Sequence, residues 1–173
     1  MNLFSKFLIK EKLKELNNQE SKLLNSVIEI YKADKTKSNL YLPRDEIFNE
    51  YSLVHEIYSK LSSKSIDALK RGLFIQWYCY TEPQYLTGIG NLKRDNEKKI
   101  FLNLKKVLDS NRGDKELLWM LNYYLSLDDN LFELYADVFD YKLYVNENEV
   151  LPSKFESNNR GQMGEYWNSI INK

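Results

Sequence analysis

SIDALKRGLFIQWYCYTEP, residues 65–83, is the stretch that decides how this chain folds. Ser65 is a good N-cap, because its side-chain oxygen can accept a hydrogen bond from a backbone N–H of the first helical turn. Pro83 disfavours α geometry at Glu82 and so sets the other end of the helix near Thr81. The stretch therefore predicts a helix from Ser65 to Thr81.

Winding this helix at 100° per residue predicts that both of its broad faces are buried. One stripe contains Ile66, Leu69, Leu73, Trp77 and Tyr80, and the far side contains Ala68, Gly72, Ile75 and Cys79. Gly72 costs about 1 kcal/mol of helix propensity relative to alanine, and the close approach of another helix is the simplest compensation. We therefore expect a central core helix, with the lining of a ligand site as an alternative role.

The same periodicity recurs along most of the chain and predicts an all-α fold. Helical stripes alternate with short polar breaks, which indicates seven to eight helices in a single domain over residues 1–173. An irregular bundle and stacked antiparallel helix pairs both fit this pattern. Residues 146–159 are a polar connector to a short C-terminal helix, whose Tyr166 and Trp167 we expect to dock on the body. Residues 1–33 fit either one helix or two.

Composition excludes several classes of protein. Formal charge is zero, from 25 basic and 25 acidic residues, so no global attraction draws the chain to nucleic acid or to a membrane. The single cysteine excludes an intramolecular disulfide and fits the reducing cytoplasm. No run of about 18 apolar residues predicts a membrane span. The many Lys, Asn, Ile and Leu residues are typical of an AT-rich bacterial genome, which makes a bacterial origin our hypothesis.

Familiar catalytic and metal-binding patterns do not occur in the sequence. There is no Walker loop, no GxSxG and no HExxH. His55 is the only histidine, which argues against a histidine-rich metal site. Cys79 has apolar helical neighbours, so we expect a raised pKa and an inert thiol. We therefore expect no metal, no cofactor and no catalytic residue, with a nucleophile pair of Cys79 and His55 as a minor alternative.

One candidate ligand site lies at the end of the opening helix. The carboxylate of Glu82 faces the negative end of the helix dipole, so we expect water, a cation or a ligand to offset that cost. The following loop, 84–91, contains two glycines that permit close backbone approach. In this reading Glu82 supplies the acid or base. The ligand-binding residues are then Arg71, Gln76, Glu82, Tyr85 and Thr87.

A second candidate is an acidic segment, residues 126–150, which holds seven acids and one base. Such a segment predicts attraction to a basic partner, with exposed tyrosines as anchors, and solvated helix faces are the alternative interpretation. The partner-binding residues predicted within it are Asp128, Asp129, Glu133, Tyr135, Asp137, Asp140, Tyr141 and Tyr144. Glu147 and Glu149 complete the acids.

These observations favour a non-catalytic helical protein that binds another protein. An immunity or inhibitor protein that masks a basic toxin is the concrete version of this hypothesis. The competing hypothesis is a small-molecule-binding protein or an enzyme, with a pocket formed by Trp77–Glu82 and the loop 84–91.

Overall fold

In the computed structural model, which describes residues 2–34, 42–144, 151 and 157–171, the opening stretch forms helix α3 (Ile66–Thr81). The N-cap prediction is confirmed, because the backbone N–H of Ala68 donates to Ser65 Oγ at 3.2 Å. The helix ends at Thr81, one residue before the extended backbone of Glu82, as the following proline predicted.

Every regular element among the described residues is helical, so the all-α prediction is confirmed. The other elements are α1 (Leu3–Asp34), α2 (Leu42–Leu61), α4 (Gln84–Thr87), α5 (Arg94–Asp109), α6 (Lys115–Leu127), α7 (Asn130–Leu134), the 3₁₀ helix η1 (Tyr141–Leu143) and α8 (Gly161–Ile171). The open question about the first 33 residues is answered by a single long helix, α1. The predicted connector, residues 146–159, lies mostly outside the described residues.

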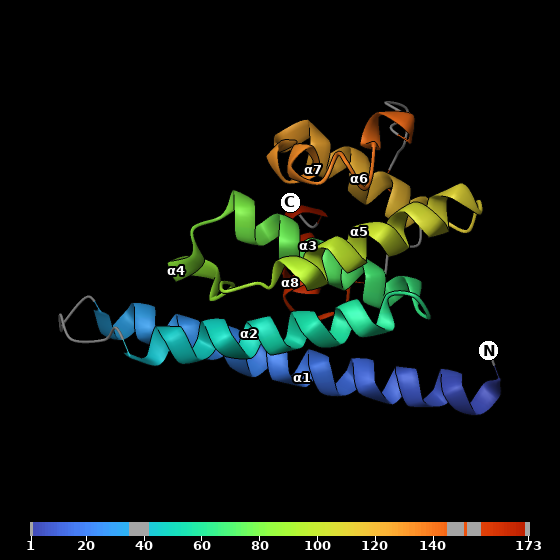
Figure 1. Cartoon of the computed structure of the whole chain (residues 1–173). Helices are drawn as coiled ribbons and strands as arrows, with labels where there is room; N and C mark the ends of the chain where they lie inside the picture. Colours follow the sequence, from blue (N-terminus) through green and yellow to red (C-terminus); the bar gives the residue numbers. More distant parts are fainter. Residues whose placement is uncertain (1, 35–41, 145–150, 152–156, 172–173) are drawn as a thin grey trace.

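The helices form an irregular bundle of three levels (Figure 1). The antiparallel pair α1 and α2 lies on one side, α6 and α7 lie on the other, and α3, α5 and α8 lie between them. Helix α3 contacts α2, α4, α5, α7 and α8, which makes it the centre of the bundle as expected. The first turns of α1 extend beyond the end of α2 (Figure 1).

Helix α3 is buried on both faces over ten consecutive residues, from Ala68 to Trp77. A Cβ added at Gly72 would lie 2.5 Å from Ile100 Cδ1 and 3.2 Å from Tyr58 Cβ, so the predicted close approach occurs against α5 and α2. The prediction for Tyr80 is wrong, because this side chain is exposed. Tyr80 lies in the last turn of α3, just after the buried run that ends at Trp77.

An aromatic cluster joins α3 to α6 and α8. The ring of Trp77 stacks on Tyr124 with centroids 4.4 Å apart, and Tyr124 stacks in turn on Trp167 at 5.9 Å. Trp167 is fully buried and Tyr166 is half-buried against Tyr78, so the predicted docking of these two C-terminal aromatics is confirmed. The cluster fixes α8 in the middle of the fold.

Two segments, the loop 84–91 and the region after Leu131, differ from what the sequence predicts. The loop 84–91 begins with one helical turn, α4, which ends at Gly88 in the left-handed conformation (φ 72°) that glycine adopts easily. The apolar spacing of Leu131, Leu134 and Val138 predicts a helix that runs to Val138, but α7 stops at Leu134 and turns follow. Leu134 is consequently exposed and does not belong to a buried stripe.

Candidate functional site

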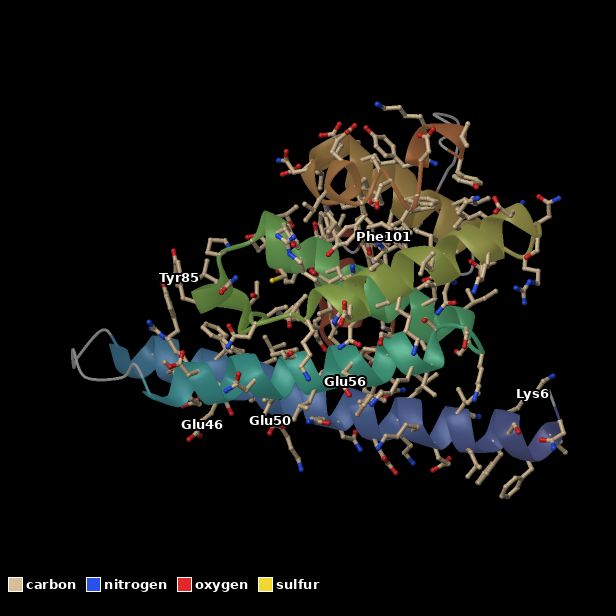
Figure 2. All side chains as sticks on the ribbon, viewed as in Figure 1. Lys6, Glu46, Glu50, Glu56, Tyr85 and Phe101 are labelled. Atoms are coloured by element: carbon tan, nitrogen blue, oxygen red, sulfur yellow. The ribbon has the colours of Figure 1, made fainter. Side chains whose placement is uncertain are left out.

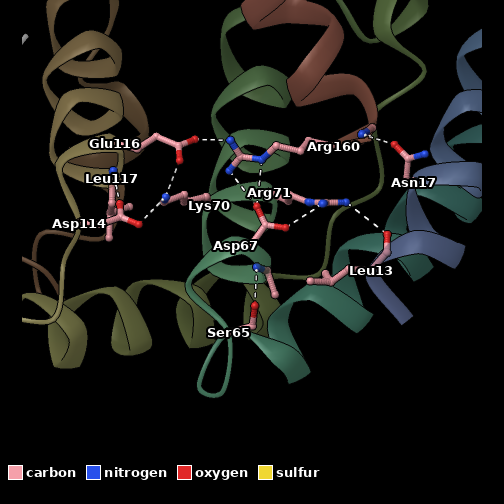
Figure 3. Close-up of polar contacts among 12 residues, drawn as sticks. Leu13, Asn17, Ser65, Asp67, Lys70, Arg71, Asp114, Glu116, Leu117 and Arg160 are labelled. Carbon is pink, nitrogen blue, oxygen red and sulfur yellow. Dashed lines mark hydrogen bonds and ion pairs between the residues drawn. The ribbon is translucent and has the colours of Figure 1, made fainter. Parts of the chain in front are cut away.

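A network of ion pairs around three buried cations surrounds the first turns of α3 (Figure 3). Lys70 Nζ lies 2.7 Å from Asp114 Oδ2 and 2.6 Å from Glu116 Oε2, both at the start of α6. Arg160, just before α8, pairs with the same Glu116 and with Asp67 at 2.8 Å. The network thus ties three helices together at one point.

Arg71 extends the network to α1, because its guanidinium pairs with Asp67 at 2.7 Å and donates to the Leu13 carbonyl at 3.3 Å. A hollow of about 600 Å³ opens beside it, between α1, α3, α6 and residues 158–160. The cations on its floor, Lys70, Arg71 and Arg160, each have carboxylate partners and are nearly enclosed. These three cations thus act as a structural cross-link between α1, α3, α6 and the start of α8.

Glu20 of α1 is a fully buried carboxylate next to this network. Tyr58 donates to Glu20 Oε1, and the backbone N–H of Gln162 donates to Oε2 at 3.0 Å. Burial raises the pKa of Glu20 to about 7, although these two hydrogen bonds and the positive charge of Arg71 partly lower it. Its position between α2 and α8 gives this carboxyl a role in joining the helices.

The predicted ligand-binding residues are not gathered around one cavity. Arg71 belongs to the charged network, near the opposite end of α3 from Glu82, so it does not offset that carboxylate. Gln76 is enclosed, and Tyr85 is exposed on α4. Thr87 is buried, with its hydroxyl accepting from the Ile89 N–H at 3.1 Å. The structure therefore disperses these residues among several environments.

Glu82 lies instead at the edge of the acidic segment. It is exposed and lines a hollow of about 240 Å³ that it shares with Trp77, Leu127, Asp128 and Tyr166. Two regions that the sequence treated as separate candidates thus meet at one surface.

The minor alternative, a Cys79–His55 pair, has no support in the geometry of the described residues. Burial lowers the pKa of His55 to about 4, an effect that the neighbouring Gln76 side chain partly offsets. The Cys79 thiol lies 3.7 Å from the Ile89 carbonyl oxygen and 3.9 Å from the Gln84 amide, with no hydrogen bond to the histidine. Burial raises the pKa of Cys79 to about 11, which confirms the predicted direction.

Residues Leu127–Leu143, which we call the acidic surface, form one compact unit. Tyr141 Oη lies 2.7 Å from Glu133 Oε1 and 3.2 Å from Asp129 Oδ2, and Lys142 Nζ lies 3.3 Å from Glu133. Five acids and one base give it a net charge of −4. Four of the acids are exposed, and these are Asp129, Glu133, Asp137 and Asp140.

The tyrosines that were predicted to be exposed partner anchors form hydrogen bonds with carboxylates of this chain. Tyr135 is buried and donates to Glu97 Oε2 of α5 at 2.7 Å. Tyr141 is buried beneath the acidic surface, and half-buried Tyr144 donates to Asp109 of α5. The prediction that these side chains are exposed is therefore wrong for Tyr135 and Tyr141. Their hydroxyls find partners on neighbouring helices, as buried tyrosines usually do.

Leucines are the exposed apolar side chains of this surface. Leu127 is 58% exposed, Leu134 is 44% exposed and Leu143 is 72% exposed. Sequence reasoning missed them, because a leucine near the end of a helical stripe reads as a core residue until the helix end is known. Exposed apolar groups among carboxylates are a usual feature of contact surfaces.

The described residues show no sign of a metal site or of a membrane span. Those residues include no group of three or more His, Cys, Asp or Glu side chains arranged to hold a metal ion. No helix within the described ranges has both the length and the apolar character needed to cross a bilayer. Comparison of the chain with protein-family models, with curated proteins and with solved structures finds no match.

Proposed function

We propose that this protein is a non-catalytic binding protein that recognises a basic protein through the acidic surface. The observation that carries this proposal is the combination of three exposed leucines with four exposed carboxylates on one compact unit. Leucines supply apolar area that a partner can cover, and carboxylates steer a basic partner to it. Glu82 and Asp128 add negative charge around the adjoining hollow of about 240 Å³.

The ionisation of the acids supports the proposal. Hydrogen bonds from Tyr141 and Lys142 lower the pKa of Glu133, so this carboxylate keeps its charge at neutral pH. Among the described residues, Asp137 has one ion-pair contact, at 3.8 Å with Lys98, and its side chain is 72% exposed. A basic partner would therefore meet charged groups that need little rearrangement to bind it.

The experiment uses the full chain as bait in an extract of its native host at low salt, followed by affinity measurement on each purified protein that is retained. We expect at least one basic protein whose affinity falls with rising salt. Leu134→Ser should weaken its binding about tenfold, because an apolar contact of roughly 1.5 kcal/mol or more is lost. Asp137→Lys should slow its association and reduce the salt dependence.

Matched controls make the result specific to this surface. Glu29 on α1 has 73% side-chain exposure against 72% for Asp137, and Leu53 on α2 is 48% exposed against 44% for Leu134. Glu29→Lys and Leu53→Ser should leave the affinity unchanged. The proposal would be contradicted if these controls weakened binding as much as Leu134→Ser and Asp137→Lys do. Retention of acidic proteins alone would also contradict it.

A specific form of the proposal is an inhibitor that masks a basic toxin. Growth of cells that produce the toxin should then be restored by the wild-type chain and not by the Leu134→Ser, Asp137→Lys double variant. Restoration by both chains would separate the inhibitor activity from the acidic surface.

A further inference from the structure

The first two turns of α1 carry four apolar side chains that nothing in the described structure covers. We call Leu3, Phe4, Phe7 and Leu8 the apolar tip; their exposed fractions range from 51% to 84%. Large apolar groups scattered singly on a surface are ordinary, but four within six residues form a contiguous patch of the kind that marks an interaction site.

The apolar tip is not the end of the stripe that packs α1 on the bundle. Winding α1 at 100° per residue places the tip on roughly the opposite side from the buried residues Leu16, Glu20 and Val27. Beyond the tip, the same outer side carries charged residues such as Glu11, Lys22 and Glu29. Packing of α1 on the bundle therefore does not require apolar residues at the tip.

Lysines accompany the apolar tip. Residues 2–14 contain four lysines and one glutamate, a net charge of +3 in a chain whose total is zero. No carboxylate of the described residues lies within ion-pair distance of Lys6, Lys10 or Lys14. Lys6 lies near the N-terminal end of α1, away from the rest of the bundle (Figure 2). An apolar ridge flanked by unpaired lysines complements a surface that is apolar inside and anionic outside.

The size of the apolar tip argues against a second copy of this chain as its occupant. With about 200 Å² for a large side chain, the four exposed fractions amount to roughly 500 Å². A stable interface needs about 800 Å² from each partner. Two tips placed together would also bring like charges, Lys6 and Lys10, close to one another.

We infer that the apolar tip docks on an anionic membrane surface, with Phe4 and Phe7 inserted among the lipids and Lys6, Lys10 and Lys14 facing their headgroups. A bilayer needs no preformed groove, so a projecting helix end can enter it as it stands. The acidic surface is carried by α7 and η1 on the opposite level of the bundle, where it would not be repelled by the headgroups (Figure 1). The zero total charge hides this separation of basic and acidic regions.

The test is cosedimentation of the full chain with vesicles at low salt. Vesicles of phosphatidylcholine with about one third phosphatidylglycerol are compared with vesicles of phosphatidylcholine alone. We expect binding to the anionic vesicles that weakens with salt, because attraction falls off within the Debye length. Phe4→Ser with Phe7→Ser should lower the partition coefficient at least tenfold. Lys6→Gln and Lys10→Gln should each lower it about fivefold.

The controls are Leu53→Ser and Lys22→Gln, which change exposed residues away from the tip. Both should bind vesicles as the wild type does, and all variants should keep their helical circular dichroism, because the described residues leave more than half of each side chain of the tip exposed. Absence of binding to anionic vesicles, or equal binding by the Phe4→Ser, Phe7→Ser variant, overturns the proposal. A dimer in light scattering that this variant dissociates, without vesicle binding, assigns the tip to a second copy.

Discussion

The charged network at the start of α3 and the acidic surface are both rich in ionised side chains, but they use them differently. In the network, Lys70 and Arg160 are nearly enclosed, and each reaches carboxylates at least 44 positions away in the sequence. On the acidic surface the carboxylates are exposed, and most of their hydrogen bonds join residues at most 12 positions apart.

This difference separates charges that hold the fold from charges that remain available to a partner. An enclosed ion pair is costly to break, because removal of one member leaves the other buried and unpaired. An exposed pair contributes little, since water solvates either member alone. Substitutions in the two regions should therefore give opposite outcomes in stability and in binding.

The largest expected effect belongs to Lys70→Met. The substitution leaves Glu116 with one cation in place of two, and Asp114 with none. We expect a loss of about 3–4 kcal/mol in the free energy of unfolding, measured by urea denaturation. Half-exposed Asp114 can gain water, which keeps the loss below that of a fully buried pair.

Lys98→Met is the matched control for this substitution. Lys98 pairs with Asp137 across 3.8 Å, and both side chains are more than half exposed. Its loss should change the free energy of unfolding by no more than about 0.5 kcal/mol. Comparable losses for the two variants would remove the distinction between the network and the acidic surface.

The second prediction concerns Glu20, beside the network. Because burial raises its pKa to about 7, above the 4.5 of an ordinary glutamate, the folded protein holds this proton more tightly than the unfolded chain does. The stabilising contribution of the protonated carboxyl is complete below pH 4.5 and is lost as the pH rises through about 7. The total contribution is about 3 kcal/mol.

Glu20→Gln removes this titration and leaves every other titrating group in place. The stability of the variant relative to wild type should therefore rise by about 3 kcal/mol between pH 4.5 and pH 8. Urea denaturation of both chains across this range measures the difference. Stability curves that stay parallel would show that Glu20 is ionised in the folded state throughout.

The smallest of the three effects is expected for Tyr135→Phe. This change leaves the enclosed Glu97 carboxylate without its 2.7 Å hydrogen bond and keeps the stacking of the ring on Phe101. We expect a loss of about 1–2 kcal/mol in thermal or urea unfolding. Tyr85→Phe, at an exposed position, should cost nothing measurable. An unchanged stability would show that this hydrogen bond contributes nothing to the fold.

Local features of the fold could be predicted from the sequence, and features that depend on distant residues could not. Ser65 was identified as an N-cap because a cap acts within three residues. Gly72 was identified as a packing position because its helix propensity is poor. Tyr80 and Leu134 were placed in buried stripes, since periodicity does not say where the covering helix ends.

The candidate site was predictable only in outline. Acidic composition identified the segment around Asp129 and Glu133, because charge is read directly from the sequence. The burial of Tyr135 and Tyr141 depends on Glu97 of α5 and on the path of the chain after Leu134. The pairing of Lys70 with α6 and of Arg160 with α3 leaves no local sequence signal at all.

The bonds of Glu20 and Asn17 to the start of α8 have a consequence for synthesis. Gly161 N–H donates to Asn17 at 2.8 Å across 144 positions, and Gln162 N–H donates to Glu20 across 142. A ribosome that adds 5–20 residues per second would take roughly 7–30 s to cover that distance. Throughout this interval α1 can pack on α2 but not on α8, so the surface of α1 that α8 covers stays exposed in the nascent chain.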